Sequence, residues 1–147
     1  MISDTKKRVG IMQPYFFPYI GYLQLVHAVD TFVFYDDVNF IKKGWIHRNQ
    51  IAVNGRASLF SIPLKDMSQN KKINEIYVDD SFGNWREKFL KTLEQNYKKA
   101  PYFTETFALV QRVLLRENQP KMSELAFWSV QEIANYVGIT TTLIPSS

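Results

Sequence analysis

A chain of 147 residues with a net charge of +4, 46% hydrophobic and 22% charged residues has the composition of one soluble globular domain, expected over residues 1–147. Because the sequence has no cysteine, disulfides and thiolate metal sites are excluded, and a reducing compartment is expected. No apolar run reaches the roughly 20 residues that span a bilayer, and no apolar region follows the basic N-terminus, so we expect a cytoplasmic protein without membrane contact.

The first elements along the chain predict a βαβ unit. An apolar run at 8–12 is expected to form a strand, and apolar residues at helical spacing predict a buried crossover helix over 19–29. The nearly continuous apolar run at 31–35 predicts a second strand that is covered on both faces. Their combined length is typical of a right-handed βαβ unit with parallel strands.

A β-hairpin is predicted next. The segments 50–53 and 57–62 flank Asn54-Gly55, which is the strongest short hairpin signal. Spaced apolar residues at 73–78 suggest a further strand. The hairpin is therefore expected as an insertion into the sheet-forming part of the chain.

The second half predicts three helices followed by a returning strand. The first helix is expected to begin at a capping box formed by Asn84 and Glu87, and the third is expected to end at Gly138. The β-branched segment 139–144 predicts a strand that rejoins the sheet. Together these elements predict an α/β fold with an open, mostly parallel sheet, a β-hairpin insertion and a helical second half, of the Rossmann-like or nucleotidyltransferase-like kind.

The most informative segment, 12–22, reads Met-Gln-Pro-Tyr-Phe-Phe-Pro-Tyr-Ile-Gly-Tyr. Its two prolines fix φ and remove two backbone donors, so the segment is expected to form a stiff corner after the first strand. Gly21 lacks a Cβ and lets another backbone or a ligand approach closely. A strand, a corner and a glycine-opened helix form the place where an open α/β sheet binds its ligand.

Candidate substrate-binding residues come from this corner and from the polar loop at 36–49. Amide, aromatic and cationic side chains in these two segments could grip the phosphates, base or sugar of a nucleotide. For each residue a structural role is the alternative. The amide could hydrogen-bond within its own loop, the aromatic rings could pack in the core, and the cations could be solvated on the surface. The candidates are Gln13, Tyr15, Phe17, Gly21, Tyr22, Lys42, Trp45, Arg48 and Asn49.

The candidate catalytic residues are Asp36, Asp37 and His47. The two aspartates end the second strand and point to opposite faces, so at most one is expected to face a pocket directly; the alternative is a simple turn. His47 is the imidazole in a polar context and could act as an acid or base, whereas His27 is expected to pack in the first helix. Two histidines placed in this way predict no metal site, and no cofactor can be named.

The block at 12–51 resembles the N-terminal signature of the WbqC-like family of bacterial proteins. Matching positions recur at fixed spacing over about forty residues, and the rest of the chain matches more loosely. The matching elements are Gln13-Pro14, Phe17-Pro18, Gly21-Tyr22, Asp30, Tyr35-Asp36-Asp37-Val38, Phe40, Lys42, Gly44-Trp45 and Arg48-Asn49.

This resemblance implies a cytoplasmic role in making O-antigen or other surface polysaccharides. Family members usually continue well beyond residue 147, so the chain is expected to be truncated or to end abruptly. A fold-level analogy with nucleotidyltransferases points to phosphate binding at the start of the first helix, and by itself it establishes no function.

The leading hypothesis is a transferase that modifies a nucleotide-linked amino sugar by acyl or aminoacyl transfer. In it Gln13 and Arg48 bind phosphate or sugar, Asp36 or Asp37 orients a hydroxyl or amine, and His47 moves a proton. The alternative is a non-catalytic nucleotide-sugar binding module. Nucleic-acid binding through the basic segment 86–116 is disfavoured because its aromatic residues have core spacing. The sequence leaves open the sugar, the donor and whether the chain forms a homo-oligomer.

Overall fold

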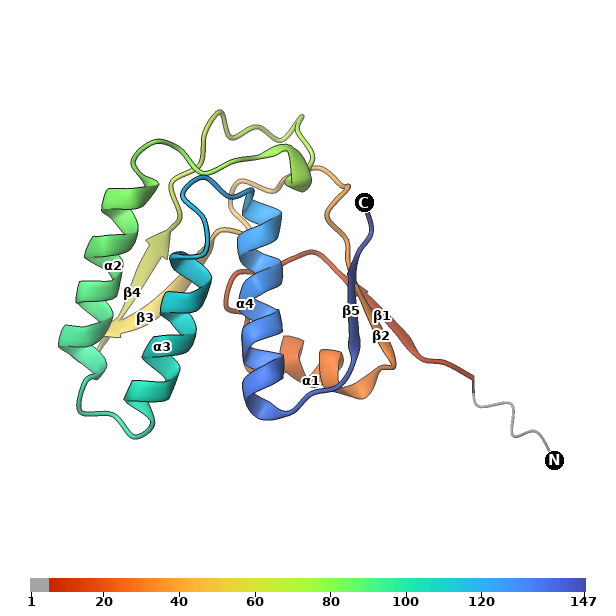
Figure 1. The fold of residues 1–147 in the computed structure, drawn as a ribbon. Helices are drawn as coiled ribbons and strands as arrows, with labels where there is room; N and C mark the ends of the chain where they lie inside the picture. The colour runs from red at the N-terminus through yellow and green to blue at the C-terminus, as the bar shows by residue number, and fades with distance from the viewer. Residues whose placement is uncertain (1–5) are drawn as a thin grey trace.

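The computed structural model describes residues 6–147 and combines a parallel sheet, an antiparallel hairpin and four α-helices within that range (Figure 1). The elements in chain order are β1 (Val9–Met12), α1 (Ile20–Ala28), β2 (Thr31–Phe34), β3 (Arg48–Val53), β4 (Arg56–Ser61), the 3₁₀ turn η1 (Ile73–Glu75), α2 (Phe82–Tyr97), α3 (Phe103–Leu114), α4 (Met122–Val137) and β5 (Thr142–Pro145). Over residues 6–147, no helix has the length and apolar character that crossing a membrane requires.

The sheet has the strand order β1-β2-β5, and both strand pairs are parallel. The predicted βαβ unit is confirmed, because β1 leads through α1 into β2 and pairs with it. The predicted return of the last strand is also confirmed, since β5 pairs with β2. In this order β2 is the central strand, and the carboxyl ends of all three strands meet at one edge of the sheet.

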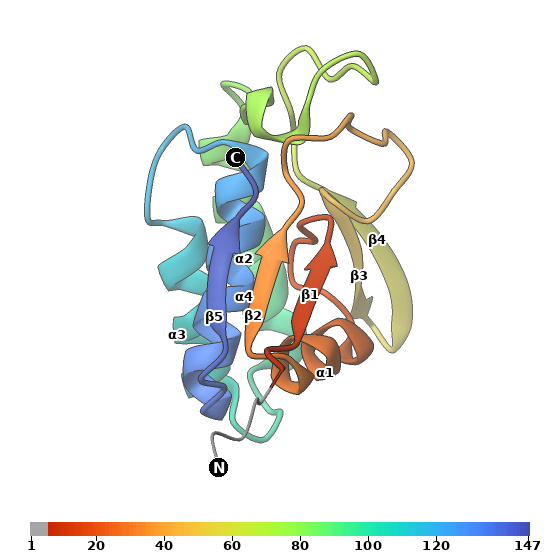
Figure 2. The ribbon, with the colours of Figure 1, turned by 90° about the vertical axis from the view of Figure 1, so that its right-hand side faces the viewer.

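Within residues 6–147, helices cover only one face of the sheet. Side chains from α1 and α4 pack with those of β2 on the covered face, and the cluster contains Tyr22, Val26, Phe32, Phe34 and Val130. In Figure 1 the sheet is seen edge-on with α1 and α4 on the same side, and in Figure 2 the strands lie in front of the helices.

The prediction that the strand at 31–35 is covered on both faces is therefore wrong. Along β2 buried residues alternate with half-buried ones, so Val33 points away from the helices. Its register neighbours on the two edge strands are Ile11, which is 58% exposed, and Ile144, which is 42% exposed. The apolar run of β2 is thus divided between a packed face and an open one.

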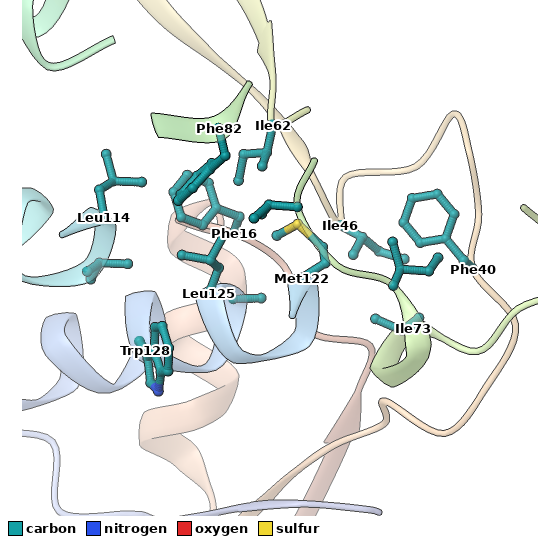
Figure 3. Packing of buried hydrophobic residues seen from close by; sticks show 14 of the residues in the cluster. Phe16, Phe40, Ile46, Ile62, Ile73, Phe82, Leu114, Met122, Leu125 and Trp128 are labelled. Carbon is teal, nitrogen blue, oxygen red and sulfur yellow. The ribbon is translucent and has the colours of Figure 1, made fainter. Parts of the chain in front are cut away.

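A larger core lies between the hairpin, α2, α3 and α4. Phe16 from the corner lies among Phe82 of α2 and Met122 and Leu125 of α4 (Figure 3). The predicted hairpin is confirmed, with Asn54 and Gly55 at positive φ as a tight hairpin turn requires. The corner thus joins the two halves of the core.

Two local predictions in this half are wrong. The segment at 73–78 forms the 3₁₀ turn η1 and isolated bridges instead of a strand, because a turn of three residues places Ile73 and Ile76 on the same buried side. Helix α2 begins at Phe82 instead of at an Asn84 capping box, since the Phe82 side chain is fully buried in the core. The predicted end of α4 is confirmed, with Gly138 in the left-handed conformation.

The open face of the sheet predicts an asymmetric response to mutation. Ile11→Thr keeps a β-branched side chain on the open face and should change the free energy of unfolding by less than about 0.5 kcal/mol. Phe32→Ala empties a site on the covered face and should cost about 3–5 kcal/mol. Urea denaturation measures both values, and a cost above about 2 kcal/mol for Ile11→Thr would mean that the face is covered in solution.

Candidate functional site

The corner after β1 contains a strained residue. Phe17 has φ 44, in the left-handed region that side chains other than glycine rarely adopt. Strain of this kind costs on the order of 1–3 kcal/mol and persists only where surrounding contacts determine the conformation. The corner must therefore be held from outside.

Two side chains from distant elements hold it. The amide Nδ2 of Asn49, in β3, donates to the carbonyl oxygen of Phe17 at 2.6 Å and to that of Phe16 at 3.4 Å. The hydroxyl of Ser129, in α4, accepts the N–H of Phe17 at 3.0 Å. In addition, the N–H of Phe16 donates to the carbonyl of Ile46 at 3.1 Å. The corner and the polar loop at 36–49, the two segments that supply the candidate binding residues, are directly bonded to each other.

Between them lies a hollow of about 310 Å³, which we call the corner cleft. Its lining residues are Tyr15, Pro18, Tyr19, Trp45 and Asn49. Tyr19 is 66% exposed and Trp45 is 46% exposed, so a phenol and an indole are available to a ligand. Aromatic rings that are exposed on a rigid frame form flat binding surfaces.

The two exposed aromatic side chains each lie against a neighbouring residue: Trp45 against Arg48, and Tyr19 against Gly21. The guanidinium of Arg48 donates from Nε to the carbonyl of Gly44 at 3.1 Å and from its other end to the carbonyl of Lys43, and it lies 5.8 Å from the Trp45 ring centroid. At Gly21, a Cβ would lie 2.4 Å from Cε2 of Tyr19. The close approach that Gly21 permits is therefore that of the Tyr19 ring, and Arg48 is occupied in shaping the loop.

Tyr22 and Gln13 are tied to each other. The Tyr22 hydroxyl donates to the backbone carbonyl of Gln13 at 2.9 Å, and burial raises the pKa of Tyr22, so the phenol stays protonated as a donor. The Gln13 side chain is half-buried at the end of β1. Phe17 packs its ring against Phe16 with centroids 4.6 Å apart, whereas Lys42 is exposed.

A second hollow, of about 530 Å³, lies at the carboxyl ends of β2 and β5, and we call it the edge crevice. The first turn of α4 and the turn η1 form its other walls. Its lining residues are Phe34, Asp36, Asn74, Lys121, Ser123, Glu124, Phe127, Trp128, Pro145 and Ser147. It shares no lining residue with the corner cleft.

Asp36 is the predicted catalytic residue that reaches this crevice. It is 5% exposed, and its carboxylate accepts hydrogen bonds from the Ser147 N–H at 3.1 Å, the Ser146 hydroxyl at 3.1 Å and the Ser147 hydroxyl at 2.9 Å. Asp37 is half-buried and accepts the Ser146 hydroxyl at 2.5 Å. As expected for adjacent residues, only Asp36 lines the hollow.

His47 lies in the interior and lines neither hollow. Its ring packs 5.2 Å from that of Phe40, and its Nδ1 has no hydrogen-bond partner within residues 6–147. Burial, with a smaller contribution from the charge of Arg48, lowers the pKa of His47 to about 4. The imidazole is therefore neutral at pH 7 and does not have the polar surroundings that the loop composition suggested.

Sequence reasoning missed Lys121, Ser123, Glu124 and Trp128. A signal was present, because a helix that leads into a parallel strand begins at the carboxyl edge of the sheet. The residues that open the last predicted helix could therefore have been placed beside Asp36. Over residues 6–147 no group of three or more His, Asp or Glu side chains is arranged to hold a metal ion.

Comparison with known proteins places the chain in a family. A family model described as the WbqC-like protein family matches residues 13–147. "Uncharacterized protein Rv1507c" from Mycobacterium tuberculosis is 30% identical over 141 residues, which cover 95% of this chain and 60% of that protein. The chain thus spans about three fifths of the length of this relative. No solved structure matches the chain significantly.

The contacts of Asn49 predict a large effect from an isosteric change. Asn49→Asp replaces the donating Nδ2 by an acceptor that faces two carbonyl oxygens, so the free energy of unfolding should fall by about 2–3 kcal/mol. Asn70→Asp, at an exposed loop position, serves as the matched control. It should change the free energy of unfolding by less than about 0.5 kcal/mol. Equal denaturation midpoints for the two variants would show that Asn49 does not hold the corner.

The low pKa of His47 predicts a pH dependence of stability. Between pH 4 and about 6.5 the unfolded chain binds the proton and the folded chain does not, so stability is complete above pH 6.5 and falls as the pH drops toward 4. The loss should be on the order of 2 kcal/mol. Urea unfolding at pH 7 and pH 4.5 measures it, with the contribution taken as the difference between His47→Gln and the original chain. A His27→Gln control should lose as much unfolding free energy between pH 7 and pH 4.5 as the original chain does. If His47→Gln also loses the same amount, His47 is not the group responsible.

Proposed function

The chain belongs to the WbqC-like protein family, and we propose that it is a cytoplasmic enzyme of bacterial surface-polysaccharide (O-antigen) biosynthesis that modifies a nucleotide-linked amino sugar by acyl or aminoacyl transfer. Family membership supports the connection to polysaccharide biosynthesis. The observation that carries the choice of ligand is the corner cleft, with its two exposed aromatic rings on a frame fixed by hydrogen bonds.

The corner cleft suits the flat parts of a nucleotide-sugar. A volume of about 310 Å³ is at the lower end of the range for small-molecule sites and accommodates a nucleoside. Stacking of a base on an aromatic side chain contributes about 1–3 kcal/mol, and Tyr19 and Trp45 also offer an O–H and an N–H at their edges. These groups support recognition of a base or a sugar ring in the cleft.

Cationic side chains lie close in the sequence to Trp45, which lines the cleft. Lys42 and Lys43 are exposed next to Trp45 and can attract the phosphates of a nucleotide-sugar. Arg48 adds positive charge while its donors hold the loop. Gln13, at the end of β1, is assigned to contact with the sugar or phosphate through its half-buried amide.

Acyl transfer to an amine requires that the amine lose a proton and that the developing oxyanion be stabilised. Asp36 is the carboxylate that reaches a hollow at the carboxyl edge, so we assign to it the orientation of an amine group. Asp37 shares the Ser146 hydroxyl with Asp36 and is assigned a supporting role. His47 is assigned no proton transfer, because it is buried and neutral.

A non-catalytic nucleotide-sugar binding module is the second candidate function. One observation favours it: His47, a residue expected to perform chemistry, is buried against Phe40 and lines neither hollow. A module of this kind needs the corner cleft and makes no demand on Asp36. The two candidates therefore differ in whether product forms.

The proposal predicts that a nucleotide-sugar binds at the corner cleft. Among uridine, guanosine and thymidine diphosphate sugars that carry an amino group, at least one should raise the melting temperature, with about 2.7 kcal/mol of added stability at 100 times its dissociation constant. Trp45→Ala and Tyr19→Ala should each weaken this binding at least about tenfold, in line with the loss of one stacked ring. Tyr102→Ala, at another exposed tyrosine, is the control and should bind as the original chain does.

Binding that is unaffected by both cleft variants, or no binding in the whole panel, would contradict the proposal. Mass spectrometry of the same mixtures with acyl donors present separates the two candidates. A mass increase of the sugar that Asp36→Asn abolishes identifies the enzyme, whereas binding without product identifies the module.

A further inference from the structure

The edge crevice contains a buried carboxylate that lacks a counter-charge. Asp36 is 5% exposed, and within residues 6–147 the ion pairs are Arg8–Asp30 and Arg112–Glu132. No lysine, arginine or histidine in that range therefore lies within 4.0 Å of the Asp36 carboxylate. Buried charges are ordinarily paired, and the hydroxyl and N–H donors of Ser146 and Ser147 leave at least one lone pair of Oδ2 without a donor. This part of the crevice suits a cationic group.

The opposite wall suits an anionic group. Ser123, on the first turn of α4, is 7% exposed and lines the crevice, and its hydroxyl has no hydrogen-bond partner in the described part of the chain. Lys121 lines the same wall, with its ammonium 5.7 Å from the Tyr77 ring centroid and no carboxylate within 4.0 Å in residues 6–147. Glu124 accepts the N–H of Lys121 at 2.8 Å and caps the start of the helix.

The start of α4 reinforces this preference. The helix has 16 residues, and the partial positive charge at the start of such a helix favours an anion. The unpartnered Ser123 hydroxyl provides a donor at that point, and Lys121 provides a full charge. A carboxylate bound there would receive both.

Apolar side chains form the remaining walls of the crevice: Phe34, Phe127, Trp128 and Pro145. Phe127 packs on Phe34 with ring centroids 4.8 Å apart, and Trp128 is held on one side by Arg116, whose guanidinium lies 4.7 Å from the indole. The crevice therefore combines a place for a cation, a place for an anion and an apolar surface. A hollow of about 530 Å³ is of the size that small-molecule ligands occupy.

We propose that the edge crevice binds a free α-amino acid with an apolar side chain. Its ammonium group binds Asp36, its carboxylate binds the Ser123 hydroxyl and Lys121 at the start of α4, and its side chain packs on Phe127 and Trp128. The inference goes beyond the proposed function, because it concerns the binding of the amino acid alone and assigns it no group-transfer step. It is tested independently of the proposed function, since binding is measured without any nucleotide-sugar.

Isothermal titration with L-phenylalanine and L-leucine tests the proposal, together with two half-ligands, 2-phenylethylamine and 3-phenylpropionate. We expect saturable binding of at least one of the two amino acids, and each half-ligand should bind at least tenfold more weakly than L-phenylalanine or not at all. Ser123→Ala and Asp36→Asn should each weaken amino-acid binding at least fivefold. Ser61→Ala and Glu117→Gln, at exposed positions outside the crevice, are the matched controls and should bind as the original chain does.

Three results would overturn the proposal: no binding of either amino acid, a half-ligand that binds as tightly as L-phenylalanine, or unchanged affinity in Ser123→Ala. Because Asp36 is hydrogen-bonded to Ser146 and Ser147, Asp36→Asn is interpreted only if its melting temperature is retained. Ser123→Ala and the half-ligands decide the question in any case. If the chain binds no nucleotide-sugar, the proposed function fails. This inference would still hold if the original chain and Trp45→Ala both bind the amino acid.

Discussion

The bonds from Asn49 and Ser129 to the backbone of Phe16 and Phe17 are the constraint on which the rest of the structure depends. Phe17 occupies a left-handed conformation that is unfavourable for a side chain, and it is kept there by groups from β3 and α4. These contacts connect the end of β1 to the hairpin and to α4. They therefore fix how the sheet lies against the larger hydrophobic core. Phe16, the residue before the strained one, is then fully buried among α2 and α4, so the strain is offset by the burial of an aromatic ring.

Both hollows follow from this placement and from the parallel order of the strands. Since β1, β2 and β5 run in the same direction, the corner, Asp36 and the start of α4 all lie toward the carboxyl edge of the sheet. The corner cleft is mostly aromatic, whereas the edge crevice combines a carboxylate and an ammonium that form no ion pair within residues 6–147 with the hydroxyl of Ser123. The two hollows therefore suit ligands of different chemistry.

The sequence predicted the elements whose signals are local. The Asn54-Gly55 turn, the helical spacing of α1 and the Gly138 end of α4 are each specified by a few neighbouring residues, and all three were confirmed. The segment at 73–78 was not, because apolar residues at positions 73, 76 and 78 fit a short strand as well as a 3₁₀ turn, and only packing against α4 decides between them. Coverage of the sheet also depends on where distant helices dock, which no local pattern contains.

For the site, the sequence located the segments but not the directions of the side chains. Polar residues in one loop were treated alike, although Trp45 lines the cleft, Arg48 bonds to the loop and His47 is buried. The residues opposite Asp36 come from positions more than 80 residues later in the chain, so their proximity is a property of the sheet order.

The most direct test of the central claim is a titration of ¹⁵N-labelled protein with the nucleotide-sugar that stabilises it. The account predicts that the largest amide shifts fall within 15–22 and 44–49, whereas shifts confined to α2 and α3 would contradict it.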